Sequence, residues 1–429
     1  MIVSADCSAS AAMHGAGPST AAARVVIGGR SFYNPRRDFA AARFASIKYM
    51  PPPTPMPRPF HSIEDARRLA RRRMPRLLFD FVDGAVGRER AARLNRRALA
   101  KIQLQPRVLN DTTGRALDAA LLGEEYALPF GVAPMGMCDL AWPGADRALA
   151  AAAARHAIPV CFSTAASTKL EDARDMAGQR AWFQLYVSDS AEAAWALVER
   201  AAKAGYTHLV FTVDVPQISL RIRDLRNGFT LPFRIGPRQF FDFALHPRWS
   251  VETLLRGVPR VMNFEAAGAG KFVREAGRGA ATWEFLERLR ERWRGRLIVK
   301  GVLSADDARR IARAGADAVY VSNHGGRQLD SAPPASDALP AIRAALGRDY
   351  PLIFDSGVRG GEDVVKALAL GADFVLLGRP WLYAIGAAGA GGPDNLVDIL
   401  AREIDVTLAQ IGRRRVGEVD ETVIKTPRG

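Results

Sequence analysis

The sequence predicts an α/β fold, a (β/α)8 TIM barrel in which eight parallel strands alternate with helices. Eight short apolar runs follow Leu128, and segments between them, such as Arg147–His156 and Ala191–Ala204, carry apolar residues at helical spacing. This alternation is typical of a parallel sheet covered by helices, and eight repeats close such a sheet into a barrel. The expected strands are Phe130–Ala133, Ile158–Phe162, Ala181–Tyr186, His208–Val213, Arg296–Lys300, Ala316–Val321, Pro351–Phe354 and Asp373–Leu377.

Residues 1–57 differ in composition from the rest of the chain. They are rich in Ala, Ser and Arg and end in seven residues of which five are proline, a composition typical of stiff, extended linkers. Few acids and several arginines also resemble a transit peptide, although the apolar core of a secretory signal is missing. We interpret the segment as a disordered basic tail, or as the result of an early start codon with Met50 or Met56 as the true start. The barrel domain is placed at residues 58–425.

A helix is expected at the start of this domain. Ser62 can accept a hydrogen bond from the backbone of Asp65, and the helical spacing continues to roughly Phe81.

A long insertion is expected between the fourth and fifth strands. Residues 222–290 are too many for a simple crossover, and they contain many large apolar side chains among Arg and Pro. A lid, an oligomer contact and a peripheral membrane patch all fit this composition.

The chain is strongly basic, with 60 Lys and Arg against 45 Asp and Glu and a formal net charge of +15. No aromatic ladder or nucleic-acid motif accompanies the arginines, so we expect no nucleic-acid partner. The positive charge fits anionic lipid or an acidic redox protein better as a binding partner.

The lengths of the apolar runs and the spacing of the cysteines indicate where in the cell the protein is expected. No apolar run reaches the about 18 residues of a membrane-spanning helix. Cys7, Cys138 and Cys161 lack the spacing of a zinc site or a disulfide framework. We therefore expect no metal and a cytoplasmic protein, with peripheral contact at the inner membrane as an option.

Functional side chains of such a barrel lie where its strands end. His324, at the end of the sixth strand, is a candidate base, and Asp214 from another strand end can stabilise its cationic form. Arg327 can grip a substrate carboxylate in bidentate fashion. Lys300 ends an apolar strand, which is an unusual place for a cation unless an anion lies beside it.

The ends of the last two strands predict a phosphate site. Asp355-Ser356-Gly357-Val358-Arg359 combines small residues with a cation, and Gly378-Arg379 adds a second glycine and a second guanidinium. The loops after strands seven and eight are where barrels commonly bind phosphate.

With these residues in place, the chain resembles the FMN-dependent 2-hydroxy-acid dehydrogenase and oxidase family, which includes L-lactate dehydrogenase, mandelate dehydrogenase and glycolate oxidase. The resemblance spans about residues 60 to 425, and the segment Ser322-Asn323-His324-Gly325-Gly326-Arg327-Gln328-Leu329-Asp330 is its most specific part. It implies FMN as the cofactor and oxidation of an L-2-hydroxy acid, lactate- or mandelate-like, to the 2-oxo acid.

The resemblance also implies roles for the matching positions. His324 would be the base, with Asp214 as its partner. Arg327 and Arg221 would hold the substrate carboxylate, and Tyr186 would hydrogen-bond near the substrate hydroxyl.

The remaining matching positions would bind FMN. Lys300 would stabilise the anionic reduced flavin. The residues that would line its ring system are Ala133, Pro134, Met135, Gly136, Ser163, Gln184 and Thr212. Those that would bind its ribityl chain and phosphate are Asp355, Gly357, Arg359, Gly378 and Arg379.

One position departs from the family's usual pattern. Phe81 stands where most members carry a tyrosine that assists the substrate carboxylate, a hydrogen bond worth about 1.5–3 kcal/mol. Phe81 would suit a bulkier or aromatic substrate, so the side chain of the substrate stays open. Gly136 and the segment His246-Pro247-Arg248-Trp249 resemble the dehydrogenases.

We therefore expect electrons to pass to a quinone or cytochrome, and the resemblance implies a homo-oligomer, a tetramer by default. An oxidase that reduces O2 to H2O2 is the nearest alternative. An FMN-binding isomerase and a non-catalytic binding protein are more distant ones.

Overall fold

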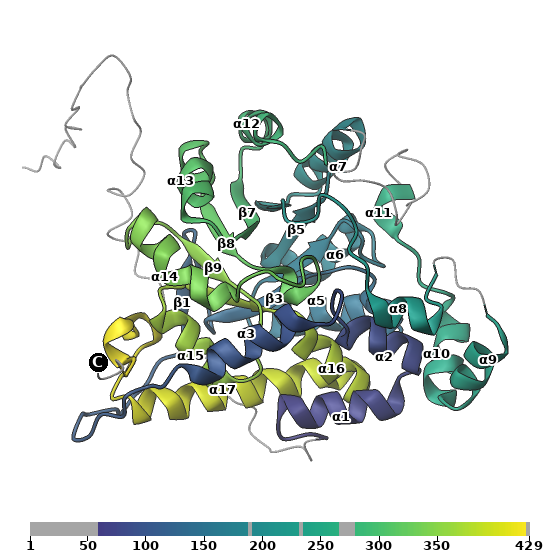
Figure 1. Cartoon of the computed structure of the whole chain (residues 1–429), viewed down its shortest axis with the longest axis horizontal. Coiled ribbons are helices and arrows are strands. Elements are labelled where there is room, and N and C mark those ends of the chain that lie inside the picture. The colour runs from purple at the N-terminus through teal and green to yellow at the C-terminus, as the bar shows by residue number, and fades with distance from the viewer. Residues whose placement is uncertain (1–58, 188–190, 231–234, 266–278, 426–429) are drawn as a thin grey trace, which may run out of the picture. The chain divides into compact units, whose positions relative to one another are not determined.

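A computed structural model describes residues 59–187, 191–230, 235–265 and 279–425. Its centre is a closed barrel in which every strand is parallel to its neighbours (Figure 1), so the predicted fold class is confirmed. The predicted strands all occur, with ends shifted by one or two residues. They are β3 (Phe130–Met135), β4 (Val160–Ser163), β5 (Ala181–Leu185), β6 (His208–Thr212), β7 (Arg296–Val302), β8 (Ala318–Val321), β9 (Leu352–Phe354) and β10 (Phe374–Leu377).

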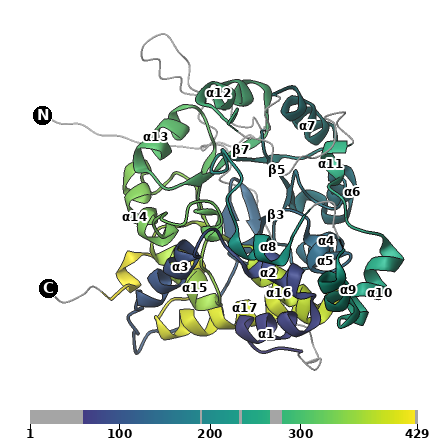
Figure 2. The same ribbon diagram turned by 45° about the vertical axis from the view of Figure 1, so that its right-hand side comes forward.

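Helices surround the strands on all sides (Figure 2). Local sequence starts several of them: Ser304, for example, accepts a hydrogen bond of 3.3 Å from the backbone nitrogen of Asp307 and so caps the helix that follows. The helices that follow strands are α4 (Cys138–Ala141), α5 (Ala145–Arg155), α6 (Leu170–Ala177), α7 (Ala191–Lys203), α12 (Trp283–Arg292), α13 (Ala305–Arg313), α14 (Ala335–Leu346), α15 (Gly361–Ala369), α16 (Arg379–Ala388) and α17 (Gly392–Gln410). The short 3-10 helices are η1 (Gly178–Arg180), η2 (His324–Gly326), η3 (Gly389–Gly391), η4 (Val416–Glu418) and η5 (Glu421–Val423).

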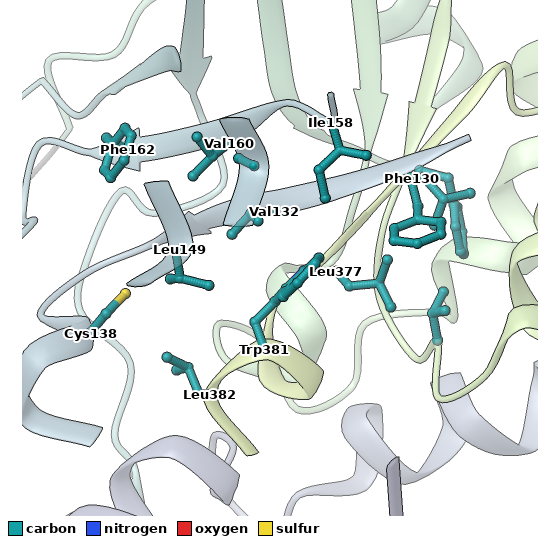
Figure 3. Close-up of a cluster of buried hydrophobic side chains, with 14 of the residues drawn as sticks. Phe130, Val132, Cys138, Leu149, Ile158, Val160, Phe162, Leu377, Trp381 and Leu382 are labelled. Carbon is teal, nitrogen blue, oxygen red and sulfur yellow. The ribbon is translucent and has the colours of Figure 1, made fainter. Parts of the chain in front are cut away.

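The main core lies between the strands and these helices. Figure 3 shows one part of it, where Trp381 of α16 packs near Phe130 and Val132 of β3 and Leu377 of β10. Trp381 is completely buried, and its indole nitrogen donates to the carbonyl of Gly131 at 3.2 Å. Removing such a side chain typically costs about 3–5 kcal/mol, so this layer fixes α16 against the barrel.

A second cluster of buried side chains fills the inside of the barrel. A hairpin that was not predicted from the sequence closes the end of the barrel at which the strands begin. The hairpin pairs β1 (Ala119–Leu121) with β2 (Glu124–Tyr126) in antiparallel fashion. Tyr126 packs against the rings of Trp182 and Phe374 at the start of the barrel strands. Because this end is plugged, the accessible cavity lies at the other end.

The first predicted helix is two helices, which corrects the expectation of one helix from Ser62 to Phe81. Ser62 does cap α1 (Ile63–Arg73), accepting from the backbone nitrogen of Asp65 at 3.1 Å. The chain then breaks at Pro75 and resumes as α2 (Arg76–Asp83). Proline cannot donate a helical hydrogen bond and disfavours a helical residue before it, and Met74 is accordingly extended. α3 (Arg90–Lys101) follows.

The predicted insertion occupies the connection from β6 to β7, as expected. Besides α12 it contains α8 (Ile222–Asn227), α9 (Pro237–Ala244), α10 (Pro247–Arg256) and α11 (Met262–Glu265). α8 lies beside α2 across the open end of the barrel (Figure 2). The expected tail of residues 1–57 lies outside the described residues.

Candidate active site

A cavity opens where the barrel strands end, and most of the predicted site residues line it. Those that line it are Phe81, Ala133, Pro134, Met135, Gly136, Tyr186, Arg221, Lys300, His324, Arg327, Asp355, Gly357, Arg359, Gly378 and Arg379. Ser163, Gln184, Thr212 and Asp214 lie behind this lining, at the ends of β4, β5 and β6. Residues far apart in the chain are thus brought to one place: Arg379 donates to the backbone carbonyl of Val82, 297 positions away.

His324 and Asp214 form a close pair at the wall of this cavity. Nδ1 of His324 lies 3.0 and 3.1 Å from the two carboxylate oxygens of Asp214, and Nε2 lies 3.5 Å from the hydroxyl of Tyr186. The backbone of His324 has φ 58°, a left-handed conformation, and its nitrogen donates to Ser322 Oγ at 3.0 Å. The sharp turn of η2 therefore presents the imidazole to both neighbours.

The surroundings favour a neutral imidazole beside a charged carboxylate. Burial lowers the pKa of His324, Asp214 opposes that effect, and Lys300 lowers the pKa again, so the net shift is downward. Burial raises the pKa of Asp214, but His324 and Lys300 outweigh it and bring the pKa below its ordinary value. A neutral histidine whose Nδ1–H points at a carboxylate keeps Nε2 as a proton acceptor.

Lys300 supplies a buried positive charge at the end of β7. Its ammonium donates to Ser322 Oγ at 3.1 Å and lies 3.8 Å from Asp355 Oδ2. Burial lowers the pKa of Lys300, but Asp214 and Asp355 raise it further than burial lowers it. The lysine therefore stays charged in a place that is only 3% exposed.

Two guanidinium groups lie over the ring of Phe81. Those of Arg221 and Arg327 are 5.8 and 5.5 Å from the centre of the ring. Arg327 is also held by backbone carbonyl oxygens, at 3.1 Å from Phe81 and 2.8 Å from Gly84. The ring of Phe81 itself stacks on Phe229 with centroids 4.6 Å apart and an interplanar angle of 7°.

Two buried polar atoms at the strand ends have no hydrogen-bond partner within the described part of the chain. They are Nε2 of Gln184 and Oγ1 of Thr212, whose residues are 1% and 3% exposed. Oγ of Ser163 donates to the side-chain oxygen Oε1 of Gln184 at 2.6 Å and so fixes the orientation of the side-chain amide. Leaving a buried polar group unpaired costs about 1–3 kcal/mol, which a bound ligand would recover.

Arg359 and Arg379 line the cavity after β9 and β10, where the phosphate was predicted. Arg379 shares the backbone carbonyls of Val82 and Gly84 with Arg327. Burial lowers the pKa of Arg359, and the neighbouring cations Arg379 and Arg96 lower it further, although Tyr383 opposes them. Gly357 and Gly378 border the same space, and a Cβ at Gly378 would meet the thioether of Met135 at 3.7 Å. Neighbouring cations beside glycine backbone suit a bound dianion.

The comparisons with known proteins match this geometry. The family model described as FMN-dependent dehydrogenase matches residues 70–426. The chain belongs to this family. An (S)-mandelate dehydrogenase of Pseudomonas putida is 40% identical to this FMN-dependent dehydrogenase over 357 residues, 82% of this chain and 90% of that protein. An L-lactate dehydrogenase of Pseudomonas syringae pv. syringae (strain B728a) is 38% identical over 372 residues, 85% of this chain and 98% of that protein.

Solved structures show the same relationship. A crystal structure described as that of the monotopic membrane protein (S)-mandelate dehydrogenase has a TM-score of 0.80 at 37% identity, covering 85% of this chain and 99% of its own. The crystal structure of a mandelate oxidase has a TM-score of 0.74 at 36% identity, covering 86% and 99%. The protein is therefore an FMN-dependent oxidoreductase that acts on the CH–OH group of 2-hydroxy acids.

The residues of this dehydrogenase fit FMN. Lys300 lines the cavity and offers a positive charge to the flavin ring. Thr212, its neighbour on β6, and Gln184 lie behind the lining and each has an unpaired polar atom that suits a polar ligand edge. The arginines and glycines after β9 and β10 suit the phosphate. These residues come from the ends of β5, β6, β7, β9 and β10.

Several supporting residues were missed by the sequence analysis. Ser356, with φ 87°, accepts from the backbone nitrogens of Asn323 and Gly325 and donates to Asp355 at 2.6 Å. Tyr320 donates to Asp355 at 2.9 Å. Ser322 and Ser356 lie within the quoted motifs and could have been chosen, whereas Asn95 on α3 carries no signal in the sequence.

Proposed function

We propose that this dehydrogenase oxidises an (S)-configured 2-hydroxy acid with a large, aryl-sized side chain, and that His324 is the base. The observation that carries the proposal is the placement of Nε2 of His324. It lies within the cavity, 3.5 Å from the Tyr186 hydroxyl, while Nδ1 is held by Asp214 at 3.0 Å. A base must lie within reach of the proton it removes and must be neutral beforehand. The position of His324 at the cavity and the lowered pKa of its imidazole support this role.

Each residue then has a defined task. Arg221 and Arg327 bind the substrate carboxylate, and Tyr186 orients the hydroxyl. Oxidation of the hydroxyl to an oxo group removes two electrons and two protons. Nε2 of His324 takes one proton, and the second proton would leave with the two electrons to the bound acceptor. Asp214 stabilises the imidazolium that forms. FMN, when bound, supplies the acceptor for the electrons.

The apolar part of the cavity supports a large substrate side chain. Phe81 lacks the hydroxyl that would bind a small acid, and its stack on Phe229 presents an aromatic surface. Further apolar side chains lie around it. They are Met137, Ala165, Val215, Ile218 and Leu382. The mandelate dehydrogenase at 40% identity acts on an acid of this kind.

Anaerobic mixing of the FMN-loaded protein with (S)-mandelate, L-lactate, glycolate and a long-chain hydroxy acid tests the proposal. We expect fastest bleaching of the flavin with (S)-mandelate and none in His324→Ala. Normal bleaching in His324→Ala would exclude this residue as the base, and faster bleaching with glycolate would exclude the aryl substrate.

We further propose that the electrons pass to a membrane quinone or a cytochrome rather than to oxygen. Gly136 supports this choice, since glycine at this position resembles the dehydrogenases. A Cβ there would lie only 3.1 Å from Cβ of Ala165, so the cavity wall has little room for a larger residue. The alternative is an oxidase. Rapid reoxidation of the reduced protein by air, with formation of peroxide, would favour that alternative over a quinone.

A peripheral contact with anionic lipid through α9 and α10 is part of this proposal. No helix among the described residues is long and apolar enough to cross a membrane. Large apolar side chains of this region are nevertheless strongly exposed, including Phe241 at 66%, Leu254 at 80% and Leu255 at 81%. Arg238 and Arg248 lie on the same two helices and can pair with lipid phosphates.

Sedimentation with anionic phosphatidylglycerol vesicles tests the lipid contact. We expect Phe241→Ser/Leu254→Ser/Leu255→Ser to lose binding. The control is Val108→Ser/Leu109→Ser, which removes equally exposed apolar side chains from a loop far from α10 in the sequence. Equal loss in both variants would exclude α9 and α10 as the contact.

Two simpler proposals concern the organisation of the chain. Residues 58–425 form the catalytic domain, and the protein is a homo-oligomer, a tetramer by default. Light scattering on the purified protein and a truncation at residue 58 test them, and a monomer or an inactive truncation would refute the corresponding proposal.

A further inference from the structure

Helix α3 lies directly against the two loops that carry the catalytic and the phosphate-binding residues. A Cβ at Gly326, in the loop after β8, would overlap the backbone nitrogen of Ala92. A Cβ at Gly357, in the loop after β9, would lie 3.0 Å from the carbonyl group of Asn95. Both glycines also have positive φ, 74° and 105°. The loops therefore rest on the backbone of one helix with no side chain between them.

One buried side chain joins this helix to the catalytic loop. Asn95 and Asn323, 228 positions apart, form a reciprocal amide pair in which each Nδ2 donates to the other's Oδ1 at 2.7 Å. Asn323 also accepts from the backbone nitrogen of Gly326 at 3.1 Å and donates to the carbonyl of Pro333 at 2.9 Å. Asn95 accepts in addition from Ala335 at 3.3 Å. The residues are 1% and 5% exposed, so little water competes.

The loop after β8 also binds the start of helix α3, through Asp330. The carboxylate of Asp330 accepts from the backbone nitrogens of Arg88 and Arg90 at 2.8 and 2.6 Å, at the start of α3. His324 lies between the two attachment points, Asn323 and Asp330. Its φ of 58° is a left-handed conformation that is unfavourable for a non-glycine residue and persists only when its surroundings enforce it.

We propose that Asn95 is a positioning residue for the oxidation: through its amide pair with Asn323 it holds the turn in which His324 faces both Asp214 and the cavity. This inference rests on the proposed role of His324 as base. Asn95 touches neither the cavity nor the reacting atoms, and it acts only through the backbone of the catalytic loop.

The test measures flavin reduction by (S)-mandelate in FMN-loaded protein for Asn95→Leu, Asn323→Leu and the double variant. Because the two amides act as a unit, we expect each single variant to lower the rate constant at saturating substrate at least about tenfold, and the double variant to be no slower than the slower single one. The KM should change less than kcat, since Arg221 lies outside this loop and Arg327 keeps its own backbone partners at Phe81 and Gly84.

A matched control separates positioning from general destabilisation. Asn395 on α17 is also a buried asparagine, and its Nδ2 donates to the carbonyl of Phe60 at 2.9 Å. Asn395→Leu should lower Tm while leaving the rate of flavin reduction unchanged. If Asn95→Leu does not fold, Asn95→Ser keeps the test open because it removes the amide pair without adding bulk.

A rate within twofold of the wild type in the Asn95 variant, or a double variant whose loss is the product of the two single losses, would overturn the inference. His324→Ala is measured alongside. If that variant reduces FMN normally, the proposed base is wrong, whereas a fast Asn95 variant beside an inactive His324→Ala refutes only the positioning role.

Discussion

At the scale of single residues, the proposed chemistry depends on a neutral His324 beside a charged Asp214. The two lie 3.0 Å apart, and the pKa values of both are lowered, which leaves the histidine neutral and the carboxylate charged. Burial lowers the pKa of the histidine, while His324 and Lys300 hold the carboxyl of Asp214 in its ionised form against the effect of burial. Lys300 therefore contributes to the readiness of the base as well as to the binding of an anion.

The pH dependence of flavin reduction follows from this arrangement. Since the pKa of His324 lies below its ordinary value, the rate should be full at neutral pH and fall only when the pH drops through that lowered pKa. Asp214→Asn removes a charge that raises the pKa of His324, so the acid limb should move to still lower pH. The rate itself should fall by about 100-fold or more, because the imidazolium loses its stabilising partner.

Stopped-flow reduction between pH 4 and pH 9, in about half-unit steps, checks this prediction. An acid limb that moves to higher pH in Asp214→Asn would contradict it, as would an unchanged rate at neutral pH.

At the scale of elements, α2 and α8 form a clamp over the open end of the barrel. Arg223 of α8 donates to Asp83 at 2.8 Å and to Glu89 at 2.7 Å. Asn227 of α8 donates to Asp80 of α2 at 2.7 Å. The clamp fixes the helix that carries Phe81, and so it sets the position of the aromatic wall of the cavity.

Arg223→Met should loosen this clamp. We expect a loss of about 1–2 kcal/mol in the free energy of unfolding, below the full cost of a buried pair because Arg223 is 33% exposed. The KM for an aryl substrate should rise, since Phe81 is less well placed. Urea unfolding and steady-state kinetics measure the two effects. The control is Arg226→Met, an exposed residue of the same helix, and an equal rise in KM there would refute the clamp.

The elements also show how far the sequence could be interpreted. The strands and the residues at their ends could be predicted because buried parallel strands are continuous apolar runs and barrel sites lie at strand ends. Pro75 marks the end of the first helix in the sequence, but the apolar residues on both sides of it keep helical spacing, so one continuous helix was predicted. Asn95 could not be predicted, because its partner Asn323 is 228 positions away and only the folded chain brings the two amides together.

At the scale of the whole molecule, the residues proposed for the chemistry lie at one end of the barrel, and residues that only stabilise the fold lie at the other. The cavity occupies one end, and the β1–β2 hairpin plugs the other with Tyr126. Near this plug, His208 is 1% exposed and stacks on Trp182 with ring centres 4.9 Å apart. Burial, and to a lesser extent Arg296, lowers the pKa of His208 to about 3.

Acid should therefore weaken the whole fold through His208. The unfolded chain binds a proton at His208 below its ordinary pKa of about 6.5, whereas the folded chain does so only near 3, so stability is lost as the pH falls between these values. His208→Phe keeps a ring against Trp182 but cannot titrate. The difference between the two proteins in unfolding free energy should shift in favour of the variant by up to roughly 5 kcal/mol across this window.

Urea unfolding at pH 7 and at lower pH measures that difference, with flavin reduction at pH 7 as the control for the distant active site. A constant difference between wild type and His208→Phe at all pH values would contradict the prediction.

The neighbouring cations of Arg359 and Arg379 also affect how the protein folds, before any substrate binds. A nascent chain that closes its barrel brings these like charges together and must hold them apart until an anion arrives. Because FMN binds the folded state, its capture should lower the population of opened molecules that proteases can attack. The FMN-free protein should therefore be cleaved faster by added protease than the FMN-loaded protein.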